Sequence, residues 1–317
     1  MTSAGDARHV GAGPPRRGSG LSPAFVEAVA GLTAGSAATL VVHPLDIVKT
    51  RMQIYSKTDA HGAATARPST ASVVRSLLDS PRPLAALYRG LTPNLLGNGT
   101  SWAAFFFFKS RMETLIKATL TPGQDLRAPH YFVASGLAGA CVQILTNPLW
   151  VLKTRMLSSD RYAAGAYPSM WVGARRLLKE EGWRGFYRGL GVSLIGVSHG
   201  AVQFAVYEPL KRFVLGRQTS TAKSRNESTL IVSSVAKLVA GAVTYPYQVV
   251  RSRLQNYNAE ERFGRGIVGV SRQIWREDSL RGFYRGLVPS VVRVMPATWV
   301  TFLVYENVKY YMPKWMA

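Results

Sequence analysis

Three copies of one short motif, spaced about 100 residues apart, constrain the fold of this chain more than any other feature. Each copy is a proline followed at the fifth and seventh positions by basic residues, and the prolines lie 104 and 98 residues apart. An aromatic-Arg-Gly element follows each copy. The motif begins at Pro44, Pro148 and Pro246, and the later element at Tyr88, Tyr187 and Tyr284. A repeat of this length indicates one structural unit that is used three times.

Long uncharged runs accompany the motifs. Four runs of at least 18 residues contain no Asp, Glu, Lys or Arg, and they cover 28–45, 91–108, 131–152 and 190–207. Two more runs contain a single cation each: Lys237 in 230–250 and Arg293 in 286–305. About 20 apolar residues cross the hydrocarbon core of a bilayer as a helix. The sequence therefore predicts an all-α membrane protein with six transmembrane helices.

The composition separates two classes of basic protein. The chain carries 39 Lys and Arg against 17 Asp and Glu, yet 47% of its residues are hydrophobic. A basic but apolar chain is typical of a membrane protein with basic loops. A soluble protein that binds nucleic acid is the alternative. The lone Cys141 predicts neither an internal disulfide nor a zinc site. Residues 1–22 lack the apolar core of a signal peptide and are expected to form a disordered tail.

The repeated motif resembles the signature of the mitochondrial carrier family, and the resemblance covers roughly residues 22–313. It implies six tilted helices in a barrel with threefold pseudosymmetry, with prolines 44, 148 and 246 kinking the odd-numbered helices. Short amphipathic helices on the matrix side are expected at 69–78, 167–179 and 267–277. The implied organisation is repeat 1 over 23–117, repeat 2 over 130–215, a polar loop over 216–229 and repeat 3 over 230–313.

The resemblance also implies a gate on the matrix side, in which the acid of one signature pairs with the first base of the next. Asp46 is accordingly expected to pair with Lys153. Trp150 and Gln248 stand where the other two acids belong, so Lys49 and Arg251 are expected to lack acidic partners. Two glutamines that follow the signatures, Gln53 and Gln255, are expected to brace the gate by hydrogen bonds.

The same positions predict a site for an anion. The cations Lys49, Lys153 and Arg251 face Asp46 alone, and unpaired charges in a membrane protein are usually functional. An anionic small molecule would complement them. The alternative is that Lys49 and Arg251 are merely hydrated in a water-filled vestibule.

Further residues are candidates for binding the substrate. The indole of Trp150 offers a face for stacking a flat ring, although a Trp that packs against lipid or a neighbouring helix is the alternative. Arg293 suits bidentate capture of phosphate or carboxylate. The remaining candidates are Lys237, Gln203 and Trp102.

Within the family, Trp150 and Gln248, together with the segment 93–102, resemble a branch that carries FAD, folate, pyridine nucleotides and pyrimidine nucleotides. FAD is the expected cargo, with folate next; neither is expected to be a prosthetic group. The resemblance further implies a multi-pass monomer in the mitochondrial inner membrane, in contact with bilayer lipid that includes cardiolipin. It also implies a cytoplasmic network of ion pairs built from Glu208, Lys211, Glu306 and Lys309. The sequence shows no catalytic triad, Walker motif or metal cluster, so no enzymatic activity is expected.

Overall fold

The computed structural model describes residues 23–56, 68–120, 126–159, 166–215 and 222–315, and its regular elements within these ranges are all helices. The predicted tail 1–22 lies outside the described residues. Repeat 1 contains α1 (Pro23–Gln53), α2 (Thr70–Leu78), α3 (Pro83–Leu87) and α4 (Leu91–Thr119). Repeat 2 contains α5 (Ala128–Ser158), α6 (Met170–Phe186), α7 (Leu190–Ile195), the 3-10 turn η1 (Gly196–Ser198) and α8 (His199–Leu215). Repeat 3 contains α9 (Ala222–Val243), α10 (Tyr245–Gln255), α11 (Ala259–Phe263), α12 (Gly266–Gly282), α13 (Leu287–Val292) and α14 (Val294–Trp315).

The long helices of neighbouring repeats pack side by side. The main helix–helix contacts are those of α4 with α5, α8 with α9, and α14 with α1. These contacts join repeat 1 to repeat 2, repeat 2 to repeat 3, and repeat 3 back to repeat 1. The helices therefore close into a ring, as the resemblance implies.

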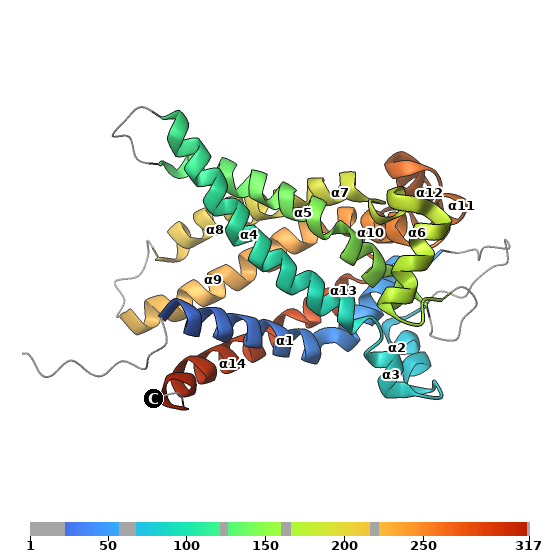
Figure 1. Ribbon diagram of the computed structural model, residues 1–317, viewed down its shortest axis with the longest axis horizontal. Coiled ribbons are helices and arrows are strands. Elements are labelled where there is room, and N and C mark those ends of the chain that lie inside the picture. The colour runs from blue at the N-terminus through green and yellow to red at the C-terminus, as the bar shows by residue number, and fades with distance from the viewer. Residues whose placement is uncertain (1–22, 57–67, 121–125, 160–165, 216–221, 316–317) are drawn as a thin grey trace, which may run out of the picture.

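The short helices gather at one end of the long ones. In Figure 1, α2, α3, α6, α11 and α12 cluster at the right of the view, whereas α14 ends at the left. Each repeat buries apolar residues where its short helix meets the end of its signature helix, which is α1, α5 or α10. In repeat 1, for example, Leu77 of α2 packs with Ile47 of α1. The predicted short helices are therefore present, and this end of the molecule is called the signature end below.

The three prolines do not act alike. Both α1 and α5 continue without interruption through Pro44 and Pro148. In repeat 3 the helix breaks at Thr244, and Pro246 lies in the first turn of the new helix α10. Proline has no N–H to donate, and it fits the first turn of a helix, where the N–H groups have no partner inside the helix.

The glycine of each aromatic-Arg-Gly element begins the next helix. Gly90, Gly189 and Gly286 have φ values of 72°, 72° and 81°. A side chain at such a backbone conformation is strained, which explains why all three repeats use glycine there. The turn sets the direction in which α4, α7 and α13 leave the signature end.

The structure departs from the predicted spans in two places. Among the described residues, four helical segments are long and apolar enough to cross a membrane: Val26–Gln53, Pro129–Ser158, Leu190–Phe213 and Leu287–Met312. The predicted span 91–108 lies in α4, whose hydropathy is lowered by polar residues such as Asn94 and Asn98. The span 230–250 is divided at Thr244, which leaves only the shorter apolar helix Val232–Val243.

The predicted polar loop 216–229 is wrong for its second part, because α9 already begins at Ala222. Residues 222–229 are polar but include good helix formers such as Ala222, Lys223, Arg225 and Glu227. Polarity alone did not distinguish a loop from the extension of a helix. Residues 216–221 lie outside the described ranges.

Candidate functional site

The first signature pair is present. Lys153 Nζ of α5 lies 3.3 Å from Asp46 Oδ2 of α1, and the Asp46 side chain is only 7% exposed. The contact that the sequence predicted between repeats 1 and 2 is thereby confirmed; its role as a gate stays a prediction. An ion pair with one nearly buried partner gains more than a fully solvated one, because water screens it less.

Arg293 joins the same carboxylate. Its Nη1 forms an ion pair with Asp46 Oδ1, and Asn94 Nδ2 of α4 lies 3.3 Å from Oδ2. We call Asp46, Lys153, Arg293 and Asn94 the Asp46 cluster. The sequence suggested Arg293 only as a contact for the substrate, about halfway along the sixth span. In the structure Arg293 is the turn residue that separates α13 from α14 inside the candidate span Leu287–Met312, and its guanidinium lies on the acid of the first signature.

Lys49 has a neutral partner in place of the missing acid. Its Nζ donates to Oε1 of Gln248, 2.9 Å away on α10. Its ammonium also lies 5.7 Å from the ring centroid of Tyr245. Lys49 is therefore not merely hydrated, because an amide oxygen accepts the hydrogen bond that a carboxylate would have accepted.

Trp150 lies between two cations. Lys153 Nζ is 5.0 Å and the guanidinium carbon of Arg251 is 5.8 Å from its ring centroid. The indole Nε1 donates to Thr146 Oγ1 at 3.1 Å, one turn earlier on α5. The distances of Lys153 and Arg251 from the ring centroid both fall within the range of cation–π attraction. The ring is held by the protein and does not face lipid alone.

The two glutamines bridge neighbouring repeats, as predicted. Gln53 donates to the Tyr245 hydroxyl at 3.0 Å and accepts from Ser252 Oγ at 2.7 Å. Gln255 accepts from Thr154 Oγ1 at 3.0 Å and approaches Asn147 Oδ1 at 3.4 Å. Leu157 stands at the equivalent position of repeat 2 and packs in the core. Glutamine braces are thus present at two of the three interfaces between repeats.

A ring of arginines was missed by the sequence analysis. The second base of each signature donates through Nε to a backbone carbonyl at the end of the signature helix of the next repeat, which is α5, α10 or α1. The contacts are Arg51 to Leu157 at 3.4 Å, Arg155 to Gln255 at 3.1 Å and Arg253 to Gln53 at 3.3 Å. The repetition of the second base was the available signal, but a backbone acceptor leaves no mark in a sequence.

A second set of contacts was also missed. The residue before each signature proline binds the carbonyl of the arginine in the aromatic-Arg-Gly element of its own repeat. The pairs are His43 Nε2 with Arg89 at 2.9 Å, Asn147 Nδ2 with Arg188 at 3.3 Å, and the Tyr245 hydroxyl with Arg285 at 3.0 Å. Because histidine, asparagine and tyrosine differ so much, the three positions do not look equivalent in the sequence.

Three predicted substrate residues lie apart from the Asp46 cluster along the helices. Trp102 is eight residues beyond Asn94 on α4, a rise of about 12 Å; its ring is 66% exposed and stacks on Phe106. Gln203 is partly buried on α8, and Lys237 is exposed on α9. Their roles in binding stay predictions.

At the opposite end, two of the residues predicted for the cytoplasmic network form ion pairs with other partners. Glu208 pairs with Arg212 of its own helix at 3.4 Å, and Lys309 pairs with Glu27 of α1 at 3.4 Å. Lys211 lies over the ring of Tyr207, and Glu306 is exposed. The signature end is joined at every interface between repeats, and the cytoplasmic network stays a prediction.

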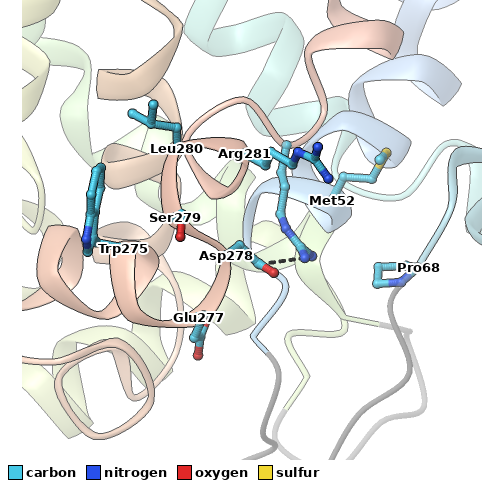
Figure 2. A pocket seen from close by; sticks show the side chains of 9 residues that line it. Met52, Pro68, Trp275, Glu277, Asp278, Ser279, Leu280 and Arg281 are labelled. Carbon is cyan, nitrogen blue, oxygen red and sulfur yellow. Dashed lines mark ion pairs between the residues drawn. The ribbon is translucent and has the colours of Figure 1, made fainter.

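A pocket of about 700 Å³ opens at the signature end, between α1 and α12. Figure 2 shows its lining, in which Met52 lies on one side, next to Arg281, and Trp275 lies on the other. The ion pair drawn there joins Asp278 to Arg285 at 2.5 Å. None of the predicted substrate residues lines this pocket. Among the described residues no group of three His, Cys, Asp or Glu could hold a metal ion.

Comparisons with known proteins agree with the threefold organisation. The family model described as mitochondrial carrier protein matches residues 21–119, 124–218 and 223–314. The chain is 36% identical to the mitochondrial FAD carrier protein of Saccharomyces cerevisiae, over 91% of this chain and 97% of that protein. It is 34% identical to the chloroplastic folate transporter 1 of Arabidopsis thaliana, over 89% and 93%. It is 32% identical to the mitochondrial nicotinamide adenine dinucleotide transporter 2 of the same plant, over 87% and 77%.

Proposed function

This chain belongs to the mitochondrial carrier family, and from that premise we propose that it carries FAD across the mitochondrial inner membrane. The relatives named above carry FAD, folate and nicotinamide adenine dinucleotide. These three cargoes share a planar ring system and anionic groups. The FAD carrier has the highest identity of the three and is aligned over nearly its whole length, which supports FAD first.

One observation carries the proposal. Of four cations at the level of the signatures, Lys153 and Arg293 pair with Asp46, whereas the contacts of the other two are neutral: Lys49 donates to Gln248 and Arg251 lies over the ring of Trp150. Four cations against one acid leave an excess of positive charge that a diphosphate complements. Trp150 lies among these cations and offers a ring on which a flavin or an adenine stacks.

The mechanism that we propose is alternating access. The signature end, which faces the matrix in the proposed orientation, is held by the links between repeats while the cytosolic end admits the substrate. An anionic group that binds Arg293 and Lys153 competes with Asp46 for them and so weakens the contact between repeats 1 and 2. A ligand shifts such an equilibrium only by binding one state better than the other.

The test is transport by the purified protein in liposomes loaded with FAD, folate, NAD or a pyrimidine nucleotide. We expect saturable uptake of FAD, with Arg293→Ala greatly slowed. Arg75→Ala is the matched control, because Arg75 is exposed on α2 and pairs only with the exposed Asp79 among the contacts described. The proposal is wrong if FAD is not taken up while another member of the panel is.

Folate is the second candidate, since the folate transporter is nearly as similar. Folate ends in carboxylates, whereas FAD has a diphosphate between its two ring systems. Competition discriminates between them: excess FAD should suppress folate uptake more than the reverse. The opposite order would favour folate as the cargo.

We also propose that the protein works as a monomer among bilayer lipids, including cardiolipin, and that it transports rather than catalyses. Supporting this, two tryptophans of α6, Trp171 and Trp183, are 73% and 72% exposed, and aromatic side chains concentrate at the bilayer interface. A carbonate wash separates this proposal from the nucleic-acid alternative. A basic nucleic-acid-binding protein should leave the membrane, whereas an integral carrier should stay.

A further inference from the structure

Trp150 occupies the place of the acid that would hold Arg251 in the ring of signature contacts. The other two corners are closed by Asp46 with Lys153 and by Gln248 with Lys49. At the third corner, between repeats 2 and 3, the residue that faces Arg251 is Trp150, 5.8 Å from guanidinium carbon to ring centroid.

The indole is held in position by its own surroundings. Its Nε1 donates to Thr146 Oγ1, and the Cα of Gly97 on α4 lies close to the ring. A Cβ added to Gly97 would meet the indole carbons at 3.6 Å, ordinary contact distance, so α4 comes right up to the ring edge. Because these contacts already fix the orientation of the indole, its interaction with Arg251 costs little further side-chain entropy.

The guanidinium of Arg251 has hydrogen-bond donors that the described part of the protein does not satisfy. Among the described residues, its Nε and Nη2 are buried and have no hydrogen-bond partner. Buried donors without a partner are rare in proteins and call for an explanation. A carboxylate in place of Trp150 would take up such donors in a bidentate pair. A ring attracts the cation through its π electrons and leaves the N–H groups free.

We propose that Trp150 is the third link of the ring, holding Arg251 by cation–π attraction while leaving Nε and Nη2 of Arg251 free to bind the anionic part of the substrate. The link closes the interface without cancelling a positive charge, and Gln248 does the same for Lys49. The second half of the proposal rests on the proposed function; the first half concerns the empty protein and does not.

The first half is tested by a double-mutant cycle on the purified carrier without substrate, using Trp150→Leu, Arg251→Gln and the double variant. We expect Trp150→Leu to lower the unfolding temperature by about 2 °C more when Arg251 is present than when it is Gln, because Arg251 attracts the ring as a cation and Gln does not. The attraction of Lys153 for the ring is present in both backgrounds and cancels in the cycle. Equal decreases in the two backgrounds would mean that Trp150 merely packs, and would overturn the link.

The second half is tested by a pair of variants that differ only in charge, Trp150→Glu and Trp150→Gln. Both lack the ring, so any loss of stacking is shared. The carboxylate should occupy the donors of Arg251 and raise the KM for FAD about tenfold above that of the glutamine variant, since those donors can then no longer form charge-assisted hydrogen bonds with the substrate. It should also raise the unfolding temperature of the empty protein.

Trp171→Glu is the control for that pair, because Trp171 is an exposed tryptophan on α6, outside the ring of signature contacts. It should leave the KM unchanged. Equal KM values for Trp150→Glu and Trp150→Gln would overturn the assignment of Arg251 donors to the substrate. If the wild-type protein does not transport FAD but the thermal cycle shows coupling, the proposed function fails and the Trp150–Arg251 link stands.

Discussion

At the residue scale, the polar contacts of the site converge on Asp46. Its carboxylate is almost buried and accepts from three side chains on different helical segments: Lys153, Arg293 and Asn94. A buried charge is tolerated only with such partners. Two of these partners are cations that an anionic substrate would also attract, so in the mechanism proposed above the carboxylate and the substrate compete for the same groups.

The first prediction concerns this competition. Asp46→Asn should destabilise the empty protein by about 3 kcal/mol, since it leaves two cations without their acid. Arg293→Gln should cost less, because Lys153 and Asn94 still satisfy Asp46. Unfolding followed by intrinsic fluorescence measures both. In the double variant only one cation is orphaned, so it should be more stable than Asp46→Asn alone; equal or lower stability would contradict the competition.

At the element scale, the three repeats use different contacts to hold the aromatic-Arg-Gly element that precedes α4, α7 or α13. In repeat 2, Glu181 of α6 binds both Arg155 at 2.6 Å and Arg188 at 2.5 Å. Repeat 3 divides the task between two neighbouring acids, because Glu277 binds Arg253 at 3.2 Å and Asp278 binds Arg285 at 2.5 Å.

Repeat 1 has no acid at the corresponding position, where Arg82 stands. Its Arg89 instead reaches across the interface to backbone oxygens of repeat 2, with Nε 2.6 Å from the carbonyl of Met156 and Nη2 3.2 Å from that of Tyr167. Where an acid is absent within one repeat, the arginine thus links two repeats.

The second prediction follows from the pKa of Glu181. Burial would raise this pKa, but the hydrogen bond and charge of Arg155 and the charge of Arg188 outweigh it, so the pKa lies below the usual 4.5. A depressed carboxyl pKa stabilises the protein above the unfolded-state value and loses that contribution as the pH falls through the folded-state value. Glu181→Gln should cost about 3 kcal/mol at pH 7. Measured against pH, its deficit relative to the wild type should shrink below about pH 4; a deficit independent of pH would contradict the assignment.

The third prediction concerns the backbone of the same segment. Gly182 in repeat 2 and Ser279 in repeat 3 both have positive φ, 65° and 53°, where α6 and α12 bend. Their ψ values of −162° and −142° lie outside the left-handed helical region, and a residue with a Cβ is strained in such a conformation by about 1–3 kcal/mol. Ser279 is exposed, so Ser279→Gly should raise stability by roughly 0.5 kcal/mol after the entropy of glycine is subtracted.

The reverse change in repeat 2 is the matched control for that prediction. Gly182→Ser should destabilise by a similar amount, and a Cβ there meets no atom within 4 Å, so strain alone is measured. Chemical denaturation of the two variants against the wild type gives both values. Changes of the same sign in the two variants would contradict the argument.

At the scale of the whole molecule, the ring of helices is fastened more regularly at one end than at the other. The signature end carries an ion pair, an amide contact, a cation–π contact and two glutamine braces between repeats. The other end carries the pair of Lys309 with Glu27 between repeats, together with one pair inside α4 and one inside α8. In the proposed mechanism, a substrate that binds the cations of the signature end would change the contacts at all three interfaces between repeats.

The fourth prediction tests this link between ligand and whole molecule. At a concentration 100-fold above its Kd, FAD should stabilise the purified carrier by about 2.7 kcal/mol through mass action. Riboflavin, which keeps the flavin ring but lacks the diphosphate and the adenosine, should give much less, because it offers the cations no anionic group. Thermal unfolding with each compound decides, and the shift by FAD should shrink with added salt. Equal protection by riboflavin would contradict a site built on charge.

The sequence by itself determined the repeat, the helical class and the places where the three copies differ. The spacing of the signatures and the uncharged runs predicted the threefold repeat and six long helices. The three short helices and the contact of Asp46 with Lys153 were implied by the family resemblance that these motifs carry. These inferences succeed because periodicity and charge are local properties that a single chain displays directly.

Only the tertiary structure decided which groups share a partner. Gln248 reaches Lys49 across 199 residues, Arg293 reaches Asp46 across 247, and Trp150 meets Arg251 between two repeats. Neutral side chains contact Lys49 and Arg251 where acids were expected. Backbone carbonyls accept hydrogen bonds from Arg89 and from the second base of each signature. These contacts depend on geometry. A hydrogen-bond donor needs only a suitably placed acceptor, and many side chains and every backbone carbonyl supply one.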